Sequence, residues 1–224
     1  MNQSVSCPHL IIPLANAPTQ LWSNFWIPPG TTPSTDAPDA HRYASIDINV
    51  THPIRTTQLA ISHFLKHDKQ GSIVHISSIA AQAPSLLCPI YIAAKHAISG
   101  FVRSLKQLER PLEDGVPKIR VTAVAPGVVK TPLWTDHPDK LKWVDETKDD
   151  WVTPEEVAER MLELVVEDEY VGGTVLEVGK GQCRKVEELN DPGPRGSGHT
   201  VSNRGDAREE VWNKLATRGW GQVT

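Results

Sequence analysis

Hydrophobic residues follow two different spacings through the middle of the chain. Over 47–67 and 89–110 they recur three and four residues apart, which places them on one face of an α-helix. Short runs of consecutive apolar residues lie around these stretches and are typical of buried β-strands. The strands are expected at 10–14, 73–76, 119–125 and 174–178.

The sequence also predicts the start of a third helix. The run Thr153-Pro154-Glu155-Glu156 combines an N-cap, a first-turn proline and two acids that suit the positive end of the helix dipole. We expect this helix to continue to about Glu167. Strands and helices then alternate along the chain, and the strands are apolar on both faces. The pattern therefore predicts an α/β fold, a parallel sheet covered by helices on both sides.

Composition divides the chain into three parts. Residues 1–45 hold seven prolines and predict an irregular segment. Residues 46–183 contain the alternating helices and strands, and predict a single domain. Residues 184–224 are polar and rich in glycine and proline, which predicts a largely flexible tail with a short helix at 207–217.

Charge and cysteine content narrow the classes of partner. The 224 residues include 23 Lys and Arg against 27 Asp and Glu, a formal charge of −4, which gives no long-range attraction for nucleic acid or an anionic membrane. No apolar run approaches the ~20 residues that span a bilayer. The 3 cysteines form no CxxC pair, as in proteins of a reducing compartment. We expect a cytoplasmic protein that binds neither nucleic acid nor membrane.

Four residues could form a site for acid–base chemistry. Tyr91 and Lys95 lie four apart on an expected helix, so the two side chains can meet. A phenol has a pKa near ~10, and a neighbouring ammonium group lowers that pKa and makes Tyr91 usable as a proton donor or acceptor. Ser78 follows a strand at the edge where open α/β sheets bind ligands, and could polarise a carbonyl. Asn49 could hold a water that relays protons to Lys95.

A Tyr–Lys pair alone is more often a solvated helix face, but the joint spacing is more specific. Ser78 is followed after thirteen residues by Tyr91, then by Lys95 and by a strand that ends at Pro126-Gly127. Over residues 46–180 the chain resembles the short-chain dehydrogenase/reductase family, and within it the 15-hydroxyprostaglandin dehydrogenase branch. The resemblance is carried by GSIVHISSIAAQAPSLLCPIYIAAKHAISGFVRSL, IRVTAVAPGVVKTPL and GGTVLEV.

The resemblance implies roles for particular residues. Tyr91 would be the general acid/base, and Lys95 would lower its pKa and bind the nicotinamide ribose. Ser78 would orient the substrate oxygen and Asn49 would complete the catalytic set. The cofactor would be NAD or NADP, and the reaction a hydride transfer between a secondary alcohol and a ketone. The residues expected at the nicotinamide end are Val129 and Thr131, although Pro126-Gly127 before them could be only a strand-ending turn.

The chain also departs from the family pattern. Members begin with a strand and a TGxxxGxG turn that holds the pyrophosphate, whereas the first glycine here is Gly30 in a proline-rich stretch. Asn16-Ala17-Pro18 resembles a worn form of the family's N-A-G. We therefore expect an N-terminally truncated member with an incomplete Rossmann-type doubly wound sheet, which keeps family strands 4-5-6-7 and lacks the first, phosphate-binding half. Weak or no cofactor binding follows.

Two other patterns have ordinary explanations. His63 and His67 lie at i and i+4, but with no third ligand apparent they are expected to face solvent, and no metal is expected. The tryptophans Trp134, Trp143 and Trp151 occupy the segment that forms the family's substrate lid. They suit a bulky apolar substrate, and ordinary packing would explain them equally well.

Three hypotheses follow. The first is an NAD(P)-dependent dehydrogenase or reductase for a bulky, apolar alcohol or ketone, forming homo-oligomers and acting in secondary metabolism. The second is a non-catalytic, truncated family member that acts as an oligomerisation or interaction protein. The third is an enzyme that uses Tyr91 as a base without a nucleotide.

Overall fold

Five strands form one sheet with the order β1-β2-β3-β4-β5. Strands β1 to β4 run parallel, and β5 is antiparallel to β4. The strands are β1 (His9–Ile11), β2 (Gly71–Ile76), β3 (Ile119–Pro126), β4 (Val175–Gly179) and β5 (Gln182–Lys185). The computed structural model describes residues 9–11, 25–26, 28–31, 34, 36–37, 42–83, 86, 88–112, 114–136, 141, 144–145, 147–188, 209, 211–213 and 215–217.

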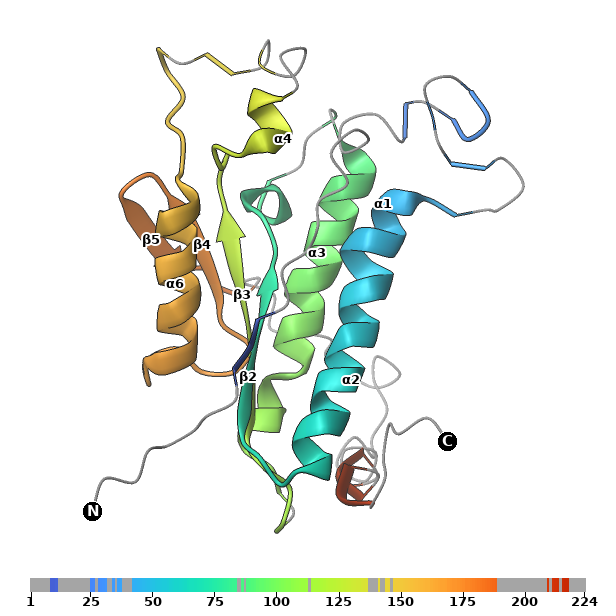
Figure 1. The fold of residues 1–224 in the computed structure, drawn as a ribbon, viewed down its shortest axis with the longest axis vertical. Helices are drawn as coiled ribbons and strands as arrows, with labels where there is room; N and C mark the ends of the chain where they lie inside the picture. Colours follow the sequence, from blue (N-terminus) through green and yellow to red (C-terminus); the bar gives the residue numbers. More distant parts are fainter. Residues whose placement is uncertain are drawn as a thin grey trace, which may run out of the picture.

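Helices cover both faces of the sheet. Helices α2 and α3 lie side by side on one face and α6 lies on the other (Figure 1). The four main helices each have a proline in the first turn, where its missing N–H costs no hydrogen bond. The helices are α1 (Ala44–Ile46), a π-helical turn (Asp47–Thr51), α2 (His52–Lys66), α3 (Pro89–Ser104), α4 (Pro132–Thr135) and α6 (Pro154–Val166), with 3-10 turns at Ile79–Ala81 and Lys106–Glu109.

The core has two parts, one on each side of the sheet. Towards α2 and α3, Phe64 packs with Ile73, Ile98 and Val121. A Cβ at Gly71 would overlap the Phe64 ring, so this side of the core depends on a glycine where β2 begins. Towards α6, the second cluster joins Val74 and Val124 of the sheet to Leu164 and other α6 residues.

The predicted fold class is confirmed. The expected strands at 73–76, 119–125 and 174–178 correspond to β2, β3 and β4, and the strand expected at 10–14 is β1 over His9–Ile11. Four parallel strands with helices on both faces are the part of a Rossmann-type sheet that the sequence predicts. Helix α3 ends earlier than expected, at Ser104, and continues as the 3-10 turn at Lys106–Glu109.

Some of residues 184–224, where a largely flexible tail with a short helix is expected, are described in the structure. Strand β5 crosses the domain boundary expected at 183. Its four residues are all exposed, so they lack the alternation of apolar and polar residues that marks a strand, and backbone pairing with β4 holds them in place. Trp212 and Leu215 are buried in the α2/α3 side of the core. These described parts of 184–224 are therefore packed.

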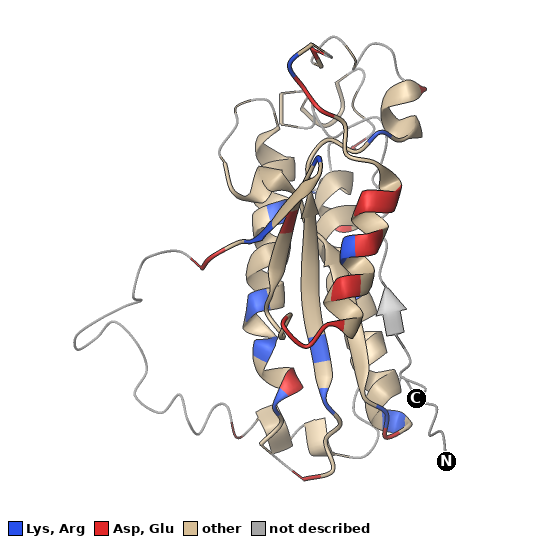
Figure 2. Cartoon of the chain, turned by 90° about the vertical axis from the view of Figure 1, so that its left-hand side faces the viewer, with Lys and Arg blue, Asp and Glu red and all other residues tan. Residues whose placement is uncertain are grey.

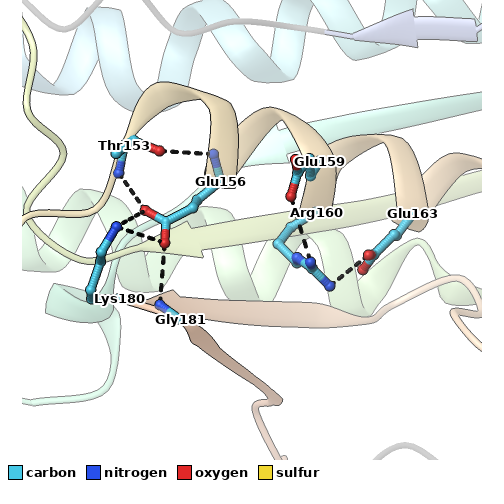
Figure 3. A network of polar contacts seen from close by, with 7 residues as sticks. All are labelled: Thr153, Glu156, Glu159, Arg160, Glu163, Lys180 and Gly181. Atoms are coloured by element: carbon cyan, nitrogen blue, oxygen red, sulfur yellow. Dashed lines mark hydrogen bonds and ion pairs between the residues drawn. The ribbon is translucent and has the colours of Figure 1, made fainter.

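The N-terminus of α6 is joined to the β4–β5 turn. Thr153 and Glu156 form the capping box: Glu156 N–H donates to Thr153 Oγ1 (3.2 Å) and Thr153 N–H donates to Glu156 Oε2 (2.7 Å). Lys180 Nζ (3.1 Å) and the Gly181 N–H (3.2 Å) also donate to Glu156 Oε1 (Figure 3). The Thr153 backbone hydrogen bond, followed by Lys180, lowers the pKa of Glu156 to about 2.

Acidic side chains follow one another along α6, with a basic residue among them, as Figure 2 shows. These charges lie on the side of α6 that faces away from the sheet, because Val157, Met161 and Leu164 are buried. The amphipathic pattern of the helix therefore directs its apolar face to the sheet and to the site described below.

Candidate functional site

A cavity of about 510 Å³ opens at the carboxyl ends of β2 and β3. The loops after these strands, the start of α3, helix α4 and the apolar face of α6 form its walls. This is the edge of a parallel sheet where ligands bind in open α/β folds. The wall residues used below are Ile76, Ser77, Ser78, Cys88, Tyr91, Val129, Thr131, Leu133, Trp134, Val157, Ala158 and Met161.

Tyr91 and Ser78 meet at the wall of this cavity. Ser78 lies just after β2 in extended conformation and its Oγ accepts a hydrogen bond from Ala80 N–H (3.2 Å). Burial raises the pKa of the Tyr91 phenol, and a hydrogen bond with the Ser78 side chain opposes that rise. The pKa of Tyr91 is therefore raised, where the sequence predicts a lowered value, because desolvation outweighs the stabilisation of the phenolate.

Lys95 lies beneath Tyr91, one turn further along α3. Its side chain is fully buried, its Nζ donates to the Ile76 carbonyl (3.0 Å), and it lies 5.4 Å from the centroid of the Tyr91 ring. Burial lowers the pKa of Lys95 to about 7. No carboxylate in the described part of the chain pairs with it. The ammonium group therefore lies near the ring of Tyr91, and its remaining N–H groups can donate hydrogen bonds to a further partner.

Asn49 lies in the π-helical turn that precedes α2. The side chain is fully buried, and its Nδ2 donates to the Ser45 carbonyl (2.9 Å). Its Oδ1 is buried and accepts no hydrogen bond from the described residues. Single π-helical turns often occur at functional sites, and this one directs an unused acceptor into the interior. Asn49 does not border the cavity.

Val129 and Thr131, which the sequence places at the nicotinamide end of a cofactor, border the cavity after β3. Val129 forms a parallel bridge with Val152, and Thr131 precedes α4. Trp134 of α4 is buried, and its ring lies edge-on to Trp151 with 5.8 Å between centroids. Trp143, the third tryptophan of the expected lid, is outside the described residues.

The structure thus brings together Ser78, Tyr91, Val129 and Thr131 on one cavity, with Lys95 beneath it and Asn49 further inside. Sequence reasoning missed the wall contributed by α6. Val157 and Met161 face the cavity as well as the core. Their helical spacing identifies a buried face, but a sequence pattern does not say which neighbour that face meets.

His75 is a further polar residue that the sequence did not single out. It is fully buried on β2, and its Nε2 lies 3.0 Å from Thr57 Oγ1, which itself donates to the Pro53 carbonyl. Nε2 therefore carries the proton. Burial, and then the charge of Lys95, lower the pKa of His75 to about 4, so the ring is neutral at neutral pH.

The two other histidines weighed above lie on the surface. His63 and His67 are exposed, with their rings 4.5 Å apart. No group of three or more metal-ligating side chains occurs in the described residues. In the same residues, no helix is long and apolar enough to span a membrane.

The site fits one end of a dinucleotide better than the other. Lys95 offers a buried ammonium, and Tyr91, Val129 and Thr131 border the adjoining cavity, which suits a ribose and a nicotinamide ring. A pyrophosphate needs a glycine-rich turn between a strand and a helix N-terminus. Over the described ranges, no strand is followed by such a turn: Ser77-Ser78 follow β2, and Gly127 stands alone after β3.

The family model of the short chain dehydrogenases matches residues 23–142. This match covers more than half of the chain and includes the cavity residues on β2, α3 and β3. The chain belongs to the short chain dehydrogenase family.

Three similar proteins illustrate the relationship. The rat (Rattus norvegicus) 15-hydroxyprostaglandin dehydrogenase [NAD(+)] is 28% identical over 148 residues, 60% of this chain and 54% of the relative. The short-chain dehydrogenase/reductase homolog YusR of Bacillus subtilis is 30% identical over 55% of this chain and 92% of the relative. A structure from Agrobacterium tumefaciens with bound NADP superposes with a TM-score of 0.51 at 25% identity, over 61% of this chain and 56% of the other.

The length of the matches differs between relatives. The chain spans 54–60% of the length of the first three curated relatives it matches. It spans nearly all of YusR. The comparison therefore shows the family, and the family match over residues 23–142 includes β2, α3 and β3.

Proposed function

We propose that this chain provides the substrate and nicotinamide side of an NAD- or NADP-dependent oxidoreductase that interconverts a secondary alcohol and a ketone. The observation that carries the proposal is the pair of hydroxyls at one wall of the cavity, Ser78 bonded to Tyr91, with the buried Lys95 beneath the Tyr91 ring. Relatives named as dehydrogenases, and a structure with bound NADP, support the same chemistry.

The proposed roles follow from the chemistry of these groups. Ser78 and Tyr91 bind the carbonyl oxygen, and in reduction Tyr91 gives its proton to the alkoxide that forms. The raised pKa keeps the phenol protonated at neutral pH, the form needed for that step. A bound nicotinamide cofactor supplies or accepts the hydride. Lys95 holds the ribose and acts on Tyr91 through its charge.

The other site residues have supporting roles. Val129 and Thr131 border the nicotinamide ring, and Asn49 uses its free Oδ1 to hold a water on the path to Lys95. Cys88 and Cys183 are free thiols, as a reducing compartment such as the cytoplasm permits. Assembly into a homo-oligomer and a role in secondary metabolism stay predictions from the family resemblance.

The decisive experiment removes the phenol oxygen. Tyr91→Phe should lower kcat for ketone reduction by about 10²–10⁴, because the proton donor is lost. Tyr43→Phe is the matched control, since Tyr43 precedes α1 and is not a wall residue. Both variants are followed by nicotinamide absorbance with a panel of neutral ketones. Full activity of Tyr91→Phe would contradict the proposal.

The same assay tests how the chain holds the cofactor. Reduced nicotinamide mononucleotide lacks the adenylate half that the family binds with its glycine-rich turn. Because the described residues fit only the nicotinamide end, KM for this shortened cofactor and for NADH should agree within about threefold. A much lower KM for NADH would place an adenylate site on residues outside those described.

A non-catalytic interaction role is the second candidate, favoured by the lack of a phosphate-binding turn in the described residues. It is tested by co-purification with a full-length family member carrying a different tag. The second role is favoured over the first if Tyr91→Phe associates with that family member as the parent does, and if neither the parent nor Tyr91→Phe turns over substrate.

A further inference from the structure

Among the described residues, the walls of the cavity carry no charged side chain. This part of the lining includes no Asp, Glu, Lys, Arg or His. Lys95 is near, but its Nζ donates to the Ile76 carbonyl and Lys95 is not part of the wall. A carboxylate that entered the cavity would lose its hydration and find no counter-ion.

Two hydroxyl groups of the wall lie next to each other. Ser78 and Tyr91 form the pair to which the reacting oxygen binds. The neighbouring Ser77 hydroxyl points away, because it bonds with Ser99 Oγ (2.8 Å) and the Lys95 carbonyl (3.2 Å) in the interior. The Ser78–Tyr91 pair is therefore the place for the reacting oxygen, and Thr131 and Cys88 are further polar residues of the wall.

The walls formed by α4 and α6 are apolar. Helix α4 contributes Leu133 and Trp134, and α6 contributes Val157 and Met161. Trp134 is held in place by its contact with Trp151, whereas a methionine adapts its shape to what it packs against. A volume of about 510 Å³ is within the ~300–1,000 Å³ typical of small-molecule sites. It has room for a ring-containing or branched body.

We propose that the substrate is an uncharged ketone or secondary alcohol with a largely apolar body, whose reacting oxygen binds to Ser78 and Tyr91. Its apolar body packs against α4 and α6, and compounds that place a carboxylate there are excluded. This inference rests on the proposed function for the position of the reacting oxygen. It specifies a substrate class that the dehydrogenase chemistry itself leaves open.

The test compares two ligands of similar size and different charge, para-methylacetophenone and para-acetylbenzoate. Each is titrated into the full chain, and its Kd is measured by ligand-observed NMR. The neutral ketone should bind at least about 100-fold more tightly, because the carboxylate is desolvated without a partner. Equal or tighter binding of the carboxylate, or no binding of the neutral ketone, would overturn the proposal.

A pair of α6 variants places the ligand in this cavity. Ala158 borders the cavity and is exposed to it, so Ala158→Phe fills space without disturbing the core. Leu162 lies one turn further on, 58% exposed and outside the wall, and Leu162→Phe is the matched control. Ala158→Phe should weaken binding of the neutral ketone about tenfold or more, and the control should not. Unchanged binding to Ala158→Phe contradicts the proposal.

Binding and turnover separate the two proposals. Selective binding of the neutral ketone without cofactor-dependent turnover would overturn the proposed function and leave the substrate class standing. Turnover of para-acetylbenzoate at the rate of para-methylacetophenone would overturn the proposed substrate class and leave the proposed function standing.

Discussion

The two faces of the sheet differ in how many polar side chains are buried next to the site. On the α2/α3 face, polar side chains are buried close to the proposed catalytic groups: Asn49, His75 and Lys95 are all fully inaccessible to solvent. On the α6 face, the cavity is bordered mostly by apolar side chains, and its polar wall residues include Ser78, Tyr91 and Thr131. The polar interior fixes the groups that act on the substrate, and the apolar side leaves space for the substrate itself.

The difference follows from how each face is packed. Towards α2 and α3, Thr57 bonds with His75 and Ser77 bonds with Ser99 across the helix–sheet boundary, while His75 Nδ1 and Asn49 Oδ1 have no hydrogen-bond partner among the described residues. Towards α6, Met161 and Val157 meet the sheet without such bonds and border open volume. Side-chain hydrogen bonds therefore join the helices to the sheet on the α2/α3 face, whereas Met161 and Val157 on the α6 face make apolar contacts and border the cavity.

The largest expected effect is a loss of stability in the core on the α2/α3 face. Phe64→Ala should reduce the free energy of unfolding by about 3–5 kcal/mol, because it empties the centre of the α2/α3 core. Met161→Ala should cost only about 2 kcal/mol, since Met161 already borders a cavity. Urea unfolding monitored by circular dichroism measures both. Equal losses would remove the proposed difference between the faces.

The second prediction concerns the charge buried beneath Tyr91. Because the pKa of Lys95 falls from 10.5 to about 7 on folding, the cost of burying its charge is full below pH 7. Between pH 7 and 10.5 the unfolded chain holds the proton more firmly than the folded one, so stability rises with pH. Lys95→Met should therefore be more stable than the parent at pH 6, by about 2–4 kcal/mol, and lose that advantage towards pH 10.

The control for this prediction is Lys106→Met, because Lys106 is 52% exposed in its side chain. Its free energy of unfolding should follow that of the parent at every pH. A Lys95→Met advantage that stays constant with pH would show that the buried ammonium group does not set the difference.

The smallest expected effect concerns the hydrogen bonds at the N-terminus of α6. Glu156→Gln weakens the bonds to Thr153, Lys180 and Gly181, and should lower the melting temperature slightly at pH 7. Since folding lowers the pKa of Glu156 from 4.5 to about 2, its contribution is complete above pH 4.5 and is lost as pH falls towards 2. The parent and Glu156→Gln should therefore melt alike at pH 2. Glu155→Gln, in the same turn and exposed, should match the parent throughout.

Much of this arrangement could be predicted from sequence because it depends on local patterns. The capping box at Thr153 and Glu156 forms as the four-residue run indicates, and the apolar runs of β2 and β3 pair in the sheet. Ser78 and Tyr91, which the joint motif and the family resemblance place in one site, both border the same cavity. Residues whose partners lie on a neighbouring turn or strand end are the ones a sequence describes well.

The rest depends on contacts between distant segments. Strand β5 is exposed and polar, and only its partner β4 defines it. Trp212 belongs to the same buried core cluster as Phe64, a contact between segments about 150 residues apart that no local pattern indicates. The raised pKa of Tyr91 reflects how deeply the phenol is enclosed, and a spacing of four residues carries no information on depth.

The π-helical turn at Asp47–Thr51 has a consequence for comparing this chain with others. Such a turn closes its hydrogen bonds over five residues, so it holds one residue more than an α-helical turn. A relative with a regular α-helix there is shifted by one residue beyond this point. An alignment that matches the two helices must open a single-residue gap between 47 and 51. Without that gap, Asn49 would be aligned with a residue from another face of the helix.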